Sequence, residues 1–110
     1  MKRTFIQTQE FSKHWERLGL NDDDLRRLEL EIMENPSSAP VIKGTGKLRK
    51  MRFAINNKGK SGSTRVCYVD FVVKETIYLI TVYPKNEKDN LSMEERRAIK
   101  SLIDRLEDSL

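Results

Sequence analysis

The spacing of hydrophobic residues predicts a short strand and then a helix at the start of the chain. Residues 3–8 are rich in β-forming side chains and alternate weakly, as a short strand does. Phe11, Trp15 and Leu18 then fall on one stripe of a helix over residues 9–18. A threonine that can cap this helix precedes it, and a glycine that can stop it follows.

A second helix is predicted after a short connection. Asn21 is a favourable N-cap residue, and the three aspartates at 22–24 suit the positive end of a helix dipole. An apolar face continues until Asn35-Pro36, where the helix must end. The two helices are expected to form a helical hairpin.

From residue 48 onward the hydrophobic period becomes two, which is typical of strands. Residues 48–55 alternate apolar with mostly basic side chains, so this strand has one apolar and one basic face. Residues 64–73 and 76–83 are apolar on both faces, as central strands are, with a tight turn at residues 74–75.

A last helix completes the expected fold. Ser92 and Glu95 have the spacing of a capping box, and apolar residues recur at helical spacing after them. The order of elements is β-α-α-β-β-β-α. We therefore expect a single α+β domain over residues 1–110, with a small antiparallel β-sheet, an N-terminal helical hairpin and a C-terminal helix.

The composition of the 110-residue chain excludes several classes of protein. No apolar run approaches the roughly 18 residues of a membrane-spanning helix. The N-terminus lacks the apolar stretch of a secretory signal. The single cysteine, Cys67, cannot form an internal disulfide, and with the single histidine, His14, it cannot form a zinc site. A cytoplasmic protein without metal or cofactor is expected.

The net charge of +4 conceals a polarity along the chain. Between Val41 and Val66 there are eight basic residues and no acidic one, while the remainder of the chain is net acidic. Such a segment is expected to face a polyanion, most often a nucleic acid. The alternative is a solvated basic face that serves solubility only. The basic residues are Lys43, Lys47, Arg49, Lys50, Arg52, Lys58, Lys60 and Arg65.

Other candidate motifs have simpler structural explanations. Residues 59–61 match the end of a phosphate-binding loop, but Ala54 stands where its first glycine belongs, and a strand rather than a helix is expected next. His14, at the edge of an apolar stripe, is expected on the surface or at the margin of the core. Cys67 is expected to be a small buried residue. No arrangement for nucleophilic hydrolysis stands out.

The basic residues of the sheet remain as candidates for a site. Lys50 and Arg52 are two apart on one strand, so their side chains leave the same face, and Arg65 opens the next strand. The run TVYPKNEK adds Tyr83, Lys85 and Asn86. Fixed cations beside an aromatic ring could hold an RNA backbone, stack a base and stabilise a pentacoordinate phosphate.

RNA carries its own nucleophile, the 2′-hydroxyl, so a protein can cleave it without a metal or a histidine. The protein must hold the 2′-oxygen in line with the scissile bond and offset the charge that develops on the phosphate. A lysine among other cations can act as acid or base, because nearby positive charge favours its neutral form. On the residues alone, a sheet that only binds RNA and one that cleaves it remain equally open.

Three stretches of the sequence give a more specific indication: VIKGTGKLRKMRFA, NNKGKSGSTRVCYV and YLITVYPKNEKDNLS. With the element order, they resemble the HigB-type branch of the RelE/ParE superfamily, the toxins of bacterial type II toxin–antitoxin systems. The similarity covers nearly the whole chain. RelE-like toxins enter the ribosomal A site and cleave mRNA there. A partner antitoxin, commonly one that binds operator DNA through a helix-turn-helix, holds them inactive.

The resemblance implies a ribosome-dependent, metal-independent endoribonuclease that stops translation in the bacterial cytoplasm. Its partners would be the ribosome, mRNA and a cognate antitoxin, with operator DNA reached only through the antitoxin. A toxin that poisons DNA gyrase is the first alternative, because it shares the fold. It ranks below the endoribonuclease, because that branch generally lacks the basic active-site set. A non-catalytic RNA-binding module is the second.

The resemblance also assigns roles to individual residues. Lys50 and Arg52 match paired basic residues that line the RelE-type active site, and Arg65 matches an arginine that contacts the scissile phosphate. The expected catalytic residues are Lys50, Arg52, Arg65, Tyr83 and Lys85. The expected RNA- or ribosome-binding residues are Lys43, Lys47, Arg49, Lys58, Lys60 and Asn86.

The sequence departs from the family pattern near the end of the last strand. Lys85 or Asn86 stands where many relatives have a further arginine. Relatives often have a catalytic tyrosine a few residues later, but residues 89–91 read Asp-Asn-Leu and the nearest tyrosine is Tyr83. The identity of the general base therefore stays open.

Overall fold

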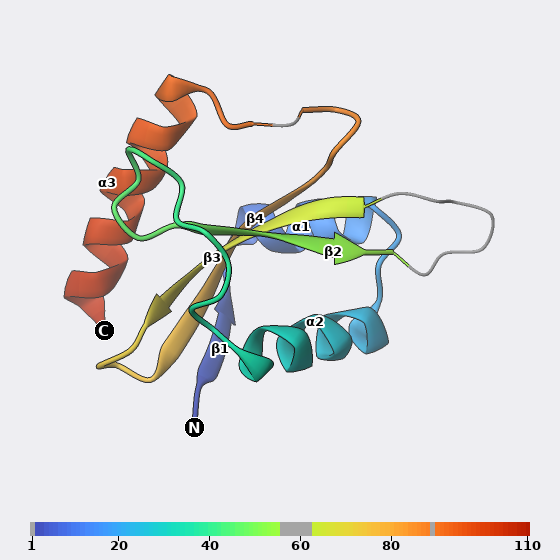
Figure 1. Ribbon diagram of the computed structural model, residues 1–110, viewed down its shortest axis with the longest axis horizontal. Helices are drawn as coiled ribbons and strands as arrows, with labels where there is room; N and C mark the ends of the chain where they lie inside the picture. Colours follow the sequence, from blue (N-terminus) through green and yellow to red (C-terminus); the bar gives the residue numbers. More distant parts are fainter. Residues whose placement is uncertain (1, 56–62, 89) are drawn as a thin grey trace.

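The computed structural model describes residues 2–55, 63–88 and 90–110 (Figure 1). Its elements are β1 (Thr4–Gln7), α1 (Gln9–Arg17), α2 (Asp22–Glu34), β2 (Arg49–Ala54), β3 (Ser63–Phe71), β4 (Thr76–Pro84) and α3 (Met93–Ser109). The predicted α+β class and the order β-α-α-β-β-β-α are confirmed. Within the described ranges, no helix has the length and apolar character needed to cross a membrane.

The four strands form one sheet in the order β1-β4-β3-β2. Strands β2, β3 and β4 are antiparallel neighbours, as expected. Strand β1 lies parallel to β4, so the sheet is mixed rather than wholly antiparallel. The helical hairpin of α1 and α2 carries the chain from β1 at one edge to β2 at the other.

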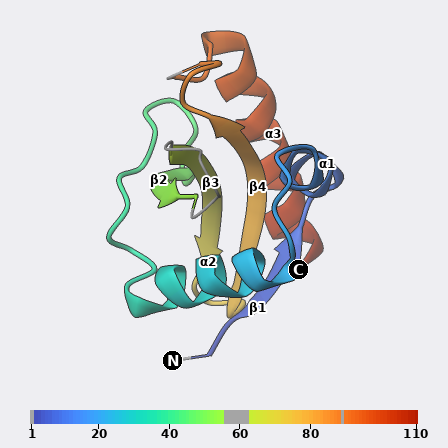
Figure 2. The same ribbon diagram turned by 90° about the vertical axis from the view of Figure 1, so that its right-hand side faces the viewer.

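The two faces of the sheet are covered by different helices (Figure 2). Helices α1 and α2 pack on one face, where Phe11, Trp15 and Phe53 form an aromatic chain with centroid separations of 5.4 and 5.8 Å. Helix α3 packs on the other face, where Ile103 is buried among residues such as Val69. Both faces therefore contribute a hydrophobic core.

Each helix begins with a capping residue, which satisfies backbone N–H groups that the helix itself leaves without partners. The Thr8 hydroxyl accepts a hydrogen bond from Phe11 N at the start of α1. Helix α2 begins with a capping box of Asn21 and Asp24, which confirms Asn21 as the N-cap residue. The predicted capping box at the start of α3 is also present.

The outer edge of β4 is covered by β1 along its first half and by α1 beyond it. Thr8 donates through its backbone N to Leu79 O (3.1 Å) and through its hydroxyl to Ile80 O (2.7 Å). His14 Nδ1 lies 3.1 Å from Val82 O, and since a carbonyl only accepts, Nδ1 carries the proton. His14 thus satisfies a carbonyl of a strand edge, in agreement with its predicted place at the margin of the core.

An irregularity in the ladder between β3 and β4 determines which side chains of β4 face α3. Cys67 pairs with Thr81, whereas the next residue, Tyr68, pairs with Leu79, so Ile80 is an extra residue on β4. Such a β-bulge interrupts the alternation of side chains along a strand. As a result Ile80 and Tyr83, three residues apart, both pack on the α3 side.

Candidate functional site

The register of the sheet brings three of the predicted catalytic residues into one row. Arg52 on β2 lies opposite Arg65 on β3, and Arg65 lies opposite Tyr83 on β4. Directly opposed residues of neighbouring strands share a face, with Cβ atoms about 5 Å apart. This face is the α3 side, because Tyr83 packs in the core beneath that helix.

A second row runs beside the first. Lys50 lies opposite Cys67, and Cys67 lies opposite Thr81. Lys50 and Arg52 therefore leave the same face, as their spacing predicted, and the Lys50 ammonium donates to Asn90 Oδ1 at 3.2 Å. Cys67 is buried, as predicted. Burial raises the pKa of its thiol to about 12, although a hydrogen bond with Tyr83 and the charges of Lys50 and Lys88 act in the opposite direction.

The chain between β4 and α3 returns along this face of the sheet (Figure 1). Lys85 N donates to Ser63 O at 3.3 Å, which extends the ladder by one step beyond the first row. The side chain of Lys85 is exposed, as is that of Arg52 at the other end of the row. The four predicted catalytic cations, Lys50, Arg52, Arg65 and Lys85, thus lie at the same end of the sheet.

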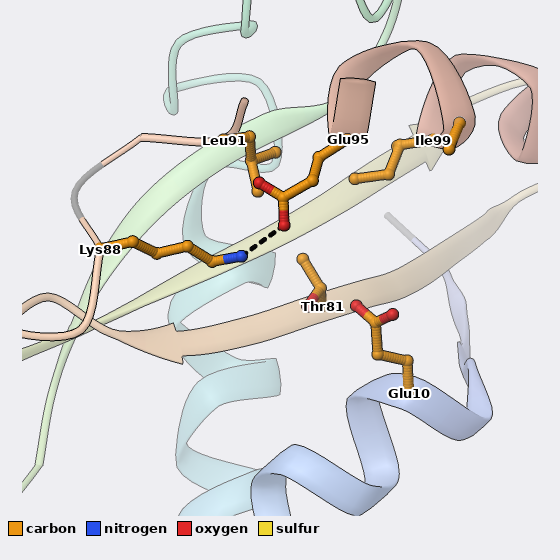
Figure 3. A pocket seen from close by; sticks show the side chains of 7 residues that line it. Glu10, Thr81, Lys88, Leu91, Glu95 and Ile99 are labelled. Carbon is orange, nitrogen blue, oxygen red and sulfur yellow. Dashed lines mark hydrogen bonds and ion pairs between the residues drawn. The ribbon is translucent and has the colours of Figure 1, made fainter. Parts of the chain in front are cut away.

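A further lysine, Lys88, joins the site from the same segment. Its ammonium lies 5.2 Å from the centroid of the Tyr83 ring and forms an ion pair with Glu95 on α3 (Figure 3). The hydrogen bond from Lys88 and another from the backbone of Ser92 hold the pKa of the Glu95 carboxyl below its usual range. One carboxylate thereby fixes both the start of α3 and the position of Lys88.

Lys88 is not among the site residues predicted from the sequence. It lies in the same run, TVYPKNEK, as the predicted Tyr83, Lys85 and Asn86. The predicted capping box places Glu95 at the start of a helix. A capping box does not by itself indicate which cation forms an ion pair with its glutamate. The only available signal was the basic character of the run.

The ring of Tyr83 is not accessible for base stacking. The residue is only 3% exposed, and Lys88 lies over its ring. A buried and covered ring cannot stack an RNA base, so that expectation does not hold for this structure. Tyr83 instead packs in the core beneath α3, in the same row as Arg52 and Arg65.

Two residues predicted to bind RNA or the ribosome are engaged elsewhere in the fold. The Arg49 guanidinium donates to the carbonyl oxygens of Ser37 (3.0 Å) and Ala39 (2.7 Å), and Arg49 pairs with Tyr68, whose side chain packs on the opposite face. Lys47 forms an ion pair of 2.6 Å with Glu107, near the end of α3. The structure does not bring either residue to the site.

The other predicted binding residues lie at the margin of the site or beyond the described ranges. Lys43 is exposed, and its carbonyl oxygen accepts a hydrogen bond from Arg96 in the first half of α3. Asn86 is exposed in the turn after β4. Lys58 and Lys60, and the residues 59–61 considered as a phosphate-binding loop, fall outside the described residues. Within the described residues, no group of three or more histidine, cysteine or carboxylate side chains could hold a metal ion.

Comparison with known proteins identifies the family of the chain. A family model described as "RelE toxin of RelE / RelB toxin-antitoxin system" matches residues 2–109. The structure is also similar to that of the E. coli toxin RelE, a mutant with two arginines replaced by alanine, in the free state. The two chains are 17% identical with a TM-score of 0.57, and the match covers 81% of this chain and 90% of that chain. The similarity to E. coli RelE supports the fold. The chain therefore belongs to the RelE toxin family, the toxin half of a toxin–antitoxin pair, so its direct partner is an antitoxin.

Proposed function

We propose that this toxin is an endoribonuclease that cleaves mRNA in the ribosomal A site without a metal or cofactor, and so inhibits translation and growth in the bacterial cytoplasm. Membership of the RelE family supports the toxin class. The cations Lys50, Arg52 and Arg65 on one face of the sheet support RNA as the target, because phosphates are the anions that such a group of cations binds.

The proposed reaction needs only groups that RNA and this face supply. The 2′-oxygen attacks the neighbouring phosphorus, and the P–O5′ bond breaks, giving a 2′,3′-cyclic phosphate and a 5′-hydroxyl end. One proton leaves the 2′-hydroxyl and one joins the departing O5′. Lys50 and Lys85 are the candidate acid and base, while Arg52 and Arg65 offset the charge on the phosphate oxygens.

The observation that carries this proposal is the opposition of Arg52 and Arg65 across β2 and β3. Like charges directly opposite each other are unfavourable for a sheet on its own. They are favourable for an anion that accepts hydrogen bonds from both, and a phosphate in a phosphorane-like transition state is such an anion.

The experiment is a brief pulse of expression followed by mapping of transcript ends, with two matched reporter mRNAs. The first reporter is translated, and the second lacks its ribosome-binding site. The proposal expects cuts inside the reading frame of the translated reporter only, with 5′-hydroxyl ends downstream of each cut. Lys74→Ala, in the exposed β3–β4 turn at the opposite end of the sheet, is the control variant and should cut as the wild type does.

Other results would contradict the proposal in distinguishable ways. Equal cutting of both reporters would remove the ribosome from the mechanism. DNA breaks with intact transcripts would favour a gyrase-directed toxin, and RNA that is bound but uncut would favour a binding module.

A further inference from the structure

A small pocket lies beside the cations of the site, and none of the residues with a role in the proposed cleavage lines it. It has a volume of about 130 Å³ and opens between the first turn of α1, the second half of β4 and the start of α3 (Figure 3). It forms there because β1 pairs with only the first half of β4. The lining residues are Glu10, Thr81, Lys88, Leu91, Glu95, Ala98 and Ile99.

The polar groups of the pocket are mostly acceptors. Glu95 is satisfied by Lys88 and by the backbone N–H of Ser92. The Glu10 carboxylate reaches from α1 toward Thr81 (Figure 3), and no ion pair or hydrogen bond joins it to another described side chain. Thr81 is only 4% exposed, yet its hydroxyl has no hydrogen-bond partner within the described part of the chain. A hydroxyl that lines a pocket beside a carboxylate is a site for a hydrogen-bond donor.

The remaining walls are apolar and come from Leu91, Ala98 and Ile99. With Glu10 and Glu95 against the single cation Lys88, the lining residues carry a net negative charge. A ligand that complements both features has an aliphatic stem and a cationic end, as the side chains of arginine and lysine do. RNA fits less well, since its phosphates would approach an unneutralised carboxylate.

We propose that this pocket receives a basic side chain of the antitoxin. The cation rows bind acidic groups of any ligand, whether RNA phosphates or carboxylates of an inhibitor. A pocket of the opposite charge one step away along β4 is useful only to a ligand that carries both signs. It would therefore let the toxin bind its antitoxin with a contact that RNA cannot imitate.

The test is the affinity of the full-length toxin for its cognate antitoxin, measured by calorimetry or fluorescence titration. Glu10→Gln removes the charge and keeps the shape of the side chain, so it should weaken binding roughly tenfold, between the values for exposed and buried ion pairs. Thr81→Val should weaken binding by a smaller factor. Glu16→Gln, an exposed glutamate on the same helix that does not line the pocket, is the control and should bind within twofold of the wild type.

A double-mutant cycle identifies the partner group. Each lysine and arginine of the antitoxin is replaced in turn by methionine. With one of these antitoxin variants, the Glu10→Gln substitution in the toxin should cause no further loss of affinity. Equal affinity of the Glu10→Gln and Glu16→Gln variants would overturn the proposal, as would a loss that couples to no basic residue. A changed base preference of mRNA cuts with unchanged antitoxin affinity would assign the pocket to RNA and also overturn it. The affinity measurements do not depend on ribosome-dependent cleavage, which the reporter experiment tests separately.

Discussion

Cations lie against aromatic rings on both faces of the sheet, but the surrounding structure differs. On the face covered by α1 and α2, the Arg27 guanidinium lies 4.2 Å from the Phe53 centroid and forms ion pairs with Asp24 and Glu31 of its own helix. On the α3 face, Lys88 lies over Tyr83 and is held by Glu95, while Arg52 is exposed.

The difference follows from how far the helices extend over each face. Two helices cover the first face, so its cations are partners of the fold, as Arg49 is for the carbonyls of Ser37 and Ala39. One helix covers the second face, and its buried residues lie beneath that helix and the segment that precedes it. Arg49 on the first face is therefore structural, whereas Arg52 on the second face is exposed, and charge alone does not separate the two cases.

The largest expected effect is on the rate of cleavage and comes from Arg65 on the α3 face. Arg65→Ala should lower single-turnover cleavage on programmed ribosomes by about 100–1000-fold, because it removes a positioned charge at the developing phosphorane. Ribosome binding should stay within a few-fold of the wild type, since docking is shared among many contacts. If the variant cleaves normally once bound, Arg65 is a docking residue and the α3 face does not hold the active site. Lys74→Ala is the control.

The second prediction uses the salt dependence of RNA affinity to count the cations that contact phosphates. Of the basic residues considered, Lys50, Arg52, Arg65 and Lys85 lie at the site. Four phosphate contacts give a log–log slope of about −3 for single-stranded RNA, or a loss of about 50-fold between 50 and 200 mM salt. Eight contacts would give a slope of about −6. Fluorescence anisotropy with a non-cleavable 2′-deoxy oligonucleotide measures the slope, and a value near −6 would contradict the division between the faces.

The third prediction concerns the covered face. Arg49→Met keeps the aliphatic stem and removes the guanidinium, leaving the carbonyls of Ser37 and Ala39 without their donor. We expect the free energy of unfolding to fall by about 1–2 kcal/mol, with little change in the rate of cleavage. Urea denaturation beside the ribosome assay measures both quantities. Loss of cleavage in a stable variant would place Arg49 in the active site.

The smallest expected effect is a pH dependence of stability through Glu95. Because its pKa is lowered in the folded state, its contribution to stability is present at neutral pH and is lost as pH falls below its ordinary value of 4.5. Glu95→Gln retains an acceptor for Ser92 N and removes the charge that holds Lys88.

The difference in unfolding free energy between the wild type and Glu95→Gln should be under about 1 kcal/mol at pH 7, since the pair is partly exposed. It should shrink toward acid pH. Glu94→Gln, an exposed neighbour, is the control. A difference that grows as pH falls would mean that Glu95 is not stabilised as a carboxylate.

Much of this arrangement follows from local patterns in the sequence. The helix boundaries follow from apolar periodicity and capping residues such as Asn21 and Ser92, because these interactions span only a few residues. Alternation along β2 places Lys50 and Arg52 on one face and Arg49 on the other, so the separation of Arg49 from the site could have been recognised without a structure.

Other features depend on contacts between distant segments. The parallel pairing of β1 with β4 joins strands that are about 70 residues apart, and neither strand's own alternation encodes it. The path of the segment after β4, which brings Lys88 over Tyr83, depends on where α3 packs. A regular alternation would also have placed Ile80 and Tyr83 on opposite faces, and the bulge reverses this result.

That bulge divides β4 into two halves with separate phases. Before Ile80, the strand presents Tyr78 to the α3 core; after it, the strand presents Thr81 and Tyr83 to the pocket and the cation row. Deleting Ile80 would therefore restore regular pleating while Tyr78, Thr81 and Tyr83 keep their faces and their partners on β3, and the core under α3 would lose only the Ile80 side chain.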